Sequence, residues 1–133
     1  MYQRINGRDW RNIWLMGDLH GCFALLMARL RRLRFDPWAD LLISVGDLID
    51  RGPQSADCLG LLRSRWFRAV RGNHEQMALE ALEALESGDM TLWQMNGGDW
   101  YARSNVRQRA DVDRLLARCQ RLPLIIEVEC AKA

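Results

Sequence analysis

The chain has 133 residues, of which 49% are hydrophobic and 27% are charged, and its formal net charge is +2. The length fits a single globular domain, and the composition is that of an ordinary soluble protein. The small charge gives no support to nucleic-acid binding, and no apolar run approaches the roughly 20 residues that cross a bilayer, so we expect neither nucleic acid nor membrane as a partner.

The N-terminus and the cysteines indicate the cellular compartment. Residues 1–14 are polar and interrupted by Gly7, so they lack the apolar core of a secretory signal. The four cysteines are scattered and form no CxxC pair, which argues against a zinc knuckle and gives little support to a disulfide framework. We therefore expect a cytoplasmic protein whose cysteines are reduced and structural.

Apolar strands and amphipathic helices alternate along the chain. Residues 12–16 are typical of a buried strand that ends at Gly17 and Asp18, and apolar side chains such as Leu26 and Leu30 then follow helical spacing. The alanine- and leucine-rich stretch after residue 73 is the strongest helix signal. The expected strands are 12–16, 41–45, 66–70 and 122–129, and the expected helices are 22–35, 55–64, 74–87 and 111–120.

The order of these elements predicts the fold class. Strand and helix alternate three times, which favours parallel strands joined by right-handed crossover helices. Residues 96–100, with the sequence NGGDW, are expected to form a turn between helical pieces. The fold class is therefore α/β, with a mostly parallel sheet and crossover helices.

Three of the strand ends carry polar side chains in a shared arrangement. Their sequences are MGDLHG at 16–21, VGDLIDRG at 45–52 and VRGNHE at 70–75. In each, an apolar strand is followed by glycine and then by a short oxygen-bearing side chain, which is Asp18, Asp47 or Asn73. Because ligands bind at the carboxyl ends of parallel strands, and glycine permits sharp turns there, we expect these side chains to converge.

The converging side chains suit a metal ion. His20 adds an imidazole to the two carboxylates and the amide oxygen, and this mixed set fits a borderline divalent ion such as Mn²⁺, Fe²⁺ or Zn²⁺. A single Gly-Asp at a strand end is more often a turn than a ligand. Three such ends in order, which together include both histidines of the chain, favour a metal site.

These blocks resemble the signature motifs of the metal-dependent phosphoprotein phosphatases, the calcineurin-like metallophosphoesterases. The resemblance is carried by GDLHG, GDLIDRG and GNHE, and the surrounding DLLISVGDLIDRGPQS, AVRGNHEQMA, MNGGDW and LPLIIE are most similar to bacterial and phage serine/threonine phosphatases of the lambda type. The similarity runs from about Tyr2 to Glu129. It implies the N-terminal part of an αββα sandwich and a phosphoprotein or phosphopeptide substrate.

The resemblance also implies a metal-ligand set. In this family two metal ions share a bridging carboxylate, and a metal-activated hydroxide attacks the phosphomonoester. By its place in GDLIDRG, Asp47 matches the bridging ligand. Asp18 and His20 match the ligands of one ion and Asn73 a ligand of the other, with manganese the expected metal and iron or zinc as alternatives.

The same resemblance implies three catalytic residues. His74 matches the residue that protonates the departing seryl or threonyl oxygen, and Asp50 matches its partner, a carboxylate that stabilises the imidazolium. Arg51 follows directly, and its planar guanidinium fits two phosphate oxygens.

The sequence departs from the family pattern after residue 129. Family members continue with two further histidines for the second ion, whereas no histidine follows His74 here. We therefore expect a single, truncated metallophosphoesterase domain over residues 1–133, with a weak second metal site and impaired turnover. Without the second sheet, one apolar face of the first sheet is expected to be bare.

Two other functions stay open. Hydrolases of bis(nucleosyl)-tetraphosphates share the metal-site blocks, and a non-catalytic remnant could bind metal or phosphate without turnover. Glu75 after His74, together with the Asp50 and Arg51 pair, favours the protein phosphatase.

Overall fold

A three-stranded parallel sheet in the order β2–β3–β4 forms the centre of the computed structural model, which describes residues 1–83 and 90–130. A second sheet consists of β1 and β5, which are also parallel. The strands are β1 (Tyr2–Asn6), β2 (Ile13–Met16), β3 (Leu41–Ser44), β4 (Phe67–Ala69) and β5 (Ile125–Glu129). The predicted α/β class with parallel strands is confirmed.

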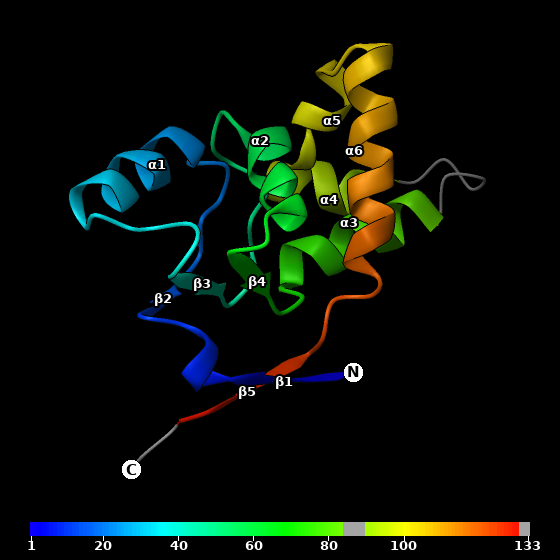
Figure 1. Cartoon of the computed structure of the whole chain (residues 1–133). Helices are drawn as coiled ribbons and strands as arrows, with labels where there is room; N and C mark the ends of the chain where they lie inside the picture. Colours follow the sequence, from blue (N-terminus) through cyan, green and yellow to red (C-terminus); the bar gives the residue numbers. More distant parts are fainter. Residues whose placement is uncertain (84–89, 131–133) are drawn as a thin grey trace.

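The helices lie together on one side of the β2–β3–β4 sheet, and the β1–β5 pair lies on the other (Figure 1). The α-helices are α1 (Phe23–Arg32), α2 (Ser55–Gly60), α3 (Asn73–Glu83), α4 (Thr91–Trp93), α5 (Trp100–Arg103) and α6 (Val106–Cys119). Short 3₁₀ turns occur at Gly7–Asp9 and Leu61–Arg63, and a π-helical turn at Gln94–Gly98. The layers are therefore helix, sheet and sheet.

The helices bury a continuous core against the central sheet. Fully buried side chains from three parts of the chain meet there, including Leu48, Leu59 and Leu116. Burial of such side chains contributes roughly 1.5–3 kcal/mol each, which is enough to hold short helices that would not form alone. The core therefore fixes the loops at the carboxyl ends of the strands.

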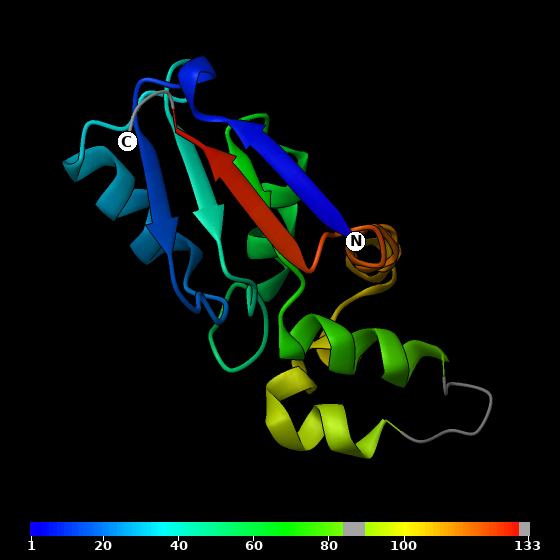
Figure 2. The same ribbon diagram turned by 90° about the horizontal axis from the view of Figure 1, so that it is seen from below.

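The two-stranded sheet corrects the expectation of a bare face. Ile5 of β1 is buried against Leu41 and Ile43 of β3, with Ile126 and Val128 of β5 packed beside them. Seen from below, β5 lies beside β3, with β1 on its far side (Figure 2). The expectation was therefore wrong for this part of β3, because residues 2–6 pair with the predicted final strand.

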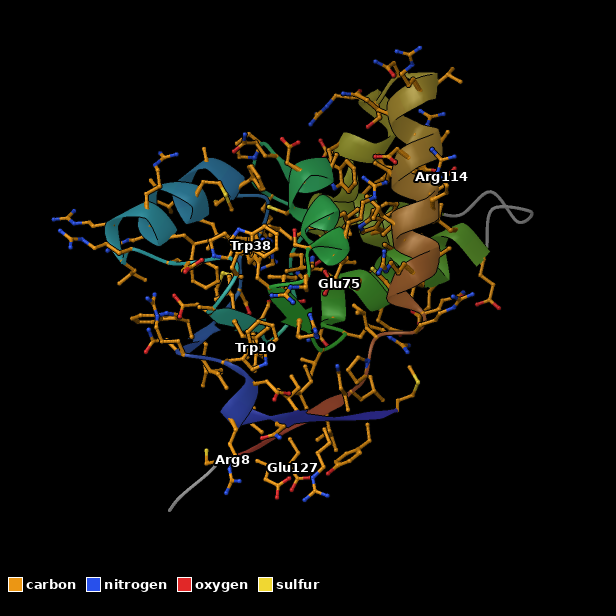
Figure 3. All side chains as sticks on the ribbon, in the orientation of Figure 1. Arg8, Trp10, Trp38, Glu75, Arg114 and Glu127 are labelled. Carbon is orange, nitrogen blue, oxygen red and sulfur yellow. The ribbon has the colours of Figure 1, made fainter. Side chains whose placement is uncertain are left out.

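Part of that face nevertheless stays open. Leu15 and Val45, near the carboxyl ends of β2 and β3, are 76% and 54% exposed. On the outer face of the β1–β5 pair, Glu127 points away from the rest of the molecule (Figure 3), and Tyr2 and Ile125 are each 59% exposed. The second sheet thus covers the amino-terminal part of the central strands and leaves the part nearest the loops uncovered.

Several helix boundaries differ from the expected ones. α6 begins at Val106 rather than at residue 111, because Asn105 and Gln108 form a reciprocal capping box that starts the helix earlier. The expected helix 55–64 is an α-helix followed by a 3₁₀ turn. The last part of the expected helix 74–87 lies outside the described residues.

The cysteines occur as free thiols. Cys58 and Cys119 are completely buried, and burial raises the pKa of each thiol to about 12. Both side chains belong to the main hydrophobic core. They therefore act as small apolar core residues, since a thiol with so high a pKa is unreactive near neutral pH.

Across residues 1–83 and 90–130, no helix combines the length and the apolar character that a membrane span requires.

Candidate active site

The loops that follow β2 and β3 are joined by backbone hydrogen bonds. The amides of Leu19 and His20 donate to the Asp47 carbonyl, at 3.0 and 2.9 Å. The loop after β4 approaches as closely, because a Cβ on Gly72 would lie 2.3 Å from the Asp47 nitrogen. Glycine at position 72 therefore lets the loop after β4 contact the loop after β3.

Asp18, His20 and Asp47 form a cluster that fits a metal ion. One ligand atom from each lies within 4.8 Å of the others. The His20 Nδ1 lies 2.9 Å from the Ile49 carbonyl oxygen. Because a carbonyl oxygen only accepts, Nδ1 carries the proton and Nε2 keeps its lone pair for a metal.

Asn73 begins α3, beside this cluster. The next residue, His74, donates its backbone amide to Asp47 Oδ1 at 2.9 Å. The Asn73 residue is exposed. This position is compatible with a ligand for a second ion, and the ligand role of Asn73 stays a prediction.

His74 and Asp50 form a buried pair next to the cluster. The His74 Nδ1–H donates to Asp50 Oδ2 at 2.8 Å, and the two side chains are 8% and 0% exposed. The His74 ring meets the His20 ring edge to face, with centroids 4.6 Å apart. The predicted acid pair and the predicted metal ligands therefore share one edge of the sheet.

Arg51 lies at the surface of the same loop. Its backbone amide donates to the Gly97 carbonyl at 3.3 Å, and the residue is exposed. An exposed guanidinium at this place is free to meet a phosphate group, although its contact with substrate stays a prediction.

The backbone is strained at these positions. Five described residues other than glycine have positive φ, and four of them are candidate site residues: His20, Asp47, Asp50 and Arg51. Such conformations cost of order 1–3 kcal/mol each and persist only where the surrounding structure enforces them. This clustering is typical of a functional site rather than of ordinary turns.

Glu75 has a role that the sequence did not reveal. Its buried carboxylate accepts from the amides of Asp47 and Gly72 through Oε1, at 2.7 and 3.0 Å, and from Leu48 through Oε2 at 3.0 Å. Burial raises the pKa of Glu75, and the three amide donors oppose that shift. Glu75 lies in the interior (Figure 3). Its hydrogen bonds join the loop after β3 to the loop after β4.

Trp93 and Trp100 were also missed. Both indole N–H groups donate to the Asp50 carboxylate, which lies 43 and 50 residues away along the chain. The NGGDW stretch at 96–100, which ends in Trp100, is expected from the sequence to form a turn, and the resemblance assigns it no role in the site. Its place among the family-like segments was the signal that could have drawn attention to it.

A family profile decides the identity of the chain, because it matches residues 11–123 and describes the calcineurin-like phosphoesterases. The chain belongs to the calcineurin-like phosphoesterase family. The match includes the loops after β2, β3 and β4 that carry the clustered side chains. The sequence-based assignment to this family is confirmed.

Individual relatives of this chain include serine/threonine-protein phosphatase 1 of Salmonella typhimurium strain LT2, 58% identical over 98% of this chain and 59% of that protein. Serine/threonine-protein phosphatase 2 of Escherichia coli K12 is 50% identical over 96% of this chain and 57% of that protein. The symmetrical bis(5'-nucleosyl)-tetraphosphatase of Methylococcus capsulatus is 36% identical over 85% of this chain and 38% of that protein.

A crystal structure provisionally designated a diadenosine tetraphosphatase has the same fold. Its TM-score is 0.63 at 26% identity, and the match covers 96% of the chain described here and 49% of the solved one. The chain thus spans between about half and three fifths of the length of these two phosphatases and of the solved chain.

Proposed function

We propose that this phosphoesterase is a serine/threonine protein phosphatase that hydrolyses phosphomonoesters and acts in the cytoplasm. The observation that carries the proposal is the contact between the His20 and His74 rings. It places the Asp50–His74 pair directly beside the Asp18, His20 and Asp47 cluster, so a proton donor and a metal site would face the same phosphate. The two relatives named serine/threonine-protein phosphatases support the substrate class.

Asp18, His20 and Asp47 would hold one divalent ion, and Asp47 with Asn73 would hold part of a second. Two carboxylates, an imidazole and an amide suit manganese, with iron or zinc as alternatives. When bound, such ions make hydroxide available near neutral pH and neutralise charge on the phosphate. Of the described residues, we assign two ligands to the second ion, Asp47 and Asn73, and three to the first.

The side chains around the metal cluster would position the substrate and move one proton. With Nδ1–H held by Asp50, the His74 imidazolium would present Nε2–H to the departing seryl or threonyl oxygen. The guanidinium of Arg51 would hold two phosphate oxygens and orient the ester for in-line attack. Hydrolysis then releases the alcohol, already protonated, and phosphate.

Two histidine variants of the chain test this division of roles. We expect His74→Asn to lower kcat on a phosphoserine peptide by roughly 10²–10⁴-fold while Mn²⁺ binding is retained. His20→Asn should instead weaken Mn²⁺ binding, and activity should recover partly at high Mn²⁺. The measurements are initial rates and calorimetric Mn²⁺ titration. A wild-type chain that binds one ion and shows no hydrolysis would contradict the proposal and favour a non-catalytic metal- or phosphate-binding remnant.

The second candidate is hydrolysis of bis(nucleosyl)-tetraphosphates. The solved structure with a TM-score of 0.63 and the Methylococcus capsulatus relative favour it. A direct comparison of kcat/KM for diadenosine tetraphosphate and for a phosphoserine peptide separates the two. We expect the phosphopeptide to be the better substrate, and the opposite ranking would overturn that preference.

A further inference from the structure

The Asp50 carboxylate is completely buried and is surrounded by N–H donors from three side chains. His74 Nδ1 donates to Oδ2 at 2.8 Å. Trp93 Nε1 lies 3.1 Å from Oδ1 and 2.9 Å from Oδ2, and Trp100 Nε1 lies 2.8 Å from Oδ1. Two indoles from one short segment therefore converge on the residue that holds the proposed proton donor.

The segment that carries these indoles is shaped to reach Asp50. Trp93 ends α4 and Trp100 begins α5, with the π-helical turn Gln94–Gly98 between them. Gly97 has φ of +103°, and a Cβ there would lie 2.8 Å from the Arg51 nitrogen. A Cβ on Gly98 would lie 2.4 Å from the Trp93 ring. Gly97 thus lets the turn pack directly on the loop that carries Asp50 and Arg51, and Gly98 leaves room for the Trp93 ring.

Packing alone does not explain the orientation of the indoles. Trp93 belongs to the main core and Trp100 packs against it. Burial alone would allow either ring any orientation that fills the space, whether or not its N–H reached Asp50. Trp14 shows the difference, because its indole nitrogen is buried without a hydrogen-bond partner. A hydrogen bond to a carboxylate is roughly twice as strong as one between neutral groups, and two of them fix the carboxylate plane.

From this geometry we propose that Trp93 and Trp100 are positioning residues for general-acid catalysis. They clamp the Asp50 carboxylate in the orientation that engages His74 Nδ1–H, and so aim His74 Nε2 at the leaving oxygen. The turn between the two tryptophans also positions the Arg51 backbone, because the Arg51 amide donates to the Gly97 carbonyl. The catalytic part of this proposal rests on the proposed function.

The choice of leaving group tests this role. A phosphoserine peptide needs its departing oxygen protonated, whereas p-nitrophenyl phosphate releases a stable anion and needs little help from an acid. We expect Trp100→Phe and Trp93→Phe to lower kcat on the phosphoserine peptide by about tenfold or more, which is part of the rate enhancement that a general acid contributes. The same variants should change kcat on p-nitrophenyl phosphate much less. The matched control, Trp14→Phe, removes an indole that makes no hydrogen bond and should affect both substrates alike.

A second measurement needs no activity. The chain has six tryptophans, so six indole N–H signals are expected in a ¹⁵N–¹H spectrum recorded without paramagnetic metal. Two of them should shift and exchange faster with solvent in Asp50→Asn, and these should be the signals lost in Trp93→Phe and Trp100→Phe. The Trp14 signal should stay in place.

The outcomes separate the two proposals. A wild-type chain that hydrolyses neither substrate would overturn the proposed function, and unresponsive indole signals would overturn the clamp independently. An equal loss on both substrates in an active, folded variant would show that the tryptophans serve packing only. Should the fully buried Trp93→Phe fail to fold, the half-buried Trp100→Phe carries the comparison.

Discussion

At the scale of single residues, Glu75 is the clearest link between folding and the site. Its two oxygens accept three backbone amides from the second and third loops. In Glu75→Gln one oxygen becomes an NH₂ group that faces a donor, so we expect a loss of about 1–3 kcal/mol in unfolding free energy and weaker Mn²⁺ binding through Asp47. Urea unfolding and metal titration measure both effects. Glu80→Gln, on the exposed side of the same helix, is the control, and equal effects from the two variants would contradict the role.

At the scale of elements, Asp40 fastens the start of β2 to the start of β3. Its buried carboxylate accepts a bidentate pair from Arg11, at 3.0 and 2.8 Å, and the amides of Asn12 and Asp36. The Arg11 hydrogen bond is the largest cause that lowers the pKa of Asp40. A lowered pKa means that the carboxylate stabilises the fold fully above the unfolded value of about 4 and loses this effect as pH falls through the folded value. Asp40→Asn should therefore melt below wild type at pH 7, and the difference should shrink below about pH 4. A constant difference in Tm, or an equal effect from the exposed Asp9→Asn, would argue against this anchor.

The elements that the sequence predicted well are those with a strong local pattern. Apolar runs located β2, β3 and β4, and the glycines after them located the loops that hold Asp18 and Asp47. β1 was missed because only Ile5 of its five residues is a buried apolar side chain, so an alternating strand looked polar. The indole contacts of Trp93 and Trp100 were missed because they join distant segments, and no local pattern encodes such a contact.

At the scale of the whole molecule, the packing of the β1–β5 pair on the central sheet is expected to contribute to the free energy of unfolding. Ile5 is 7% exposed and lies between the sheets, whereas Arg4 on the opposite face of β1 makes only exposed ion pairs with Glu127 and Glu129. Removing three buried carbon atoms leaves a cavity, so Ile5→Ala should cost about 2–4 kcal/mol. Arg4→Ala should cost less than about 1 kcal/mol, since exposed ion pairs contribute little. Urea unfolding of both variants measures the difference. Equal costs would mean that the packing of Ile5 between the sheets adds little to stability.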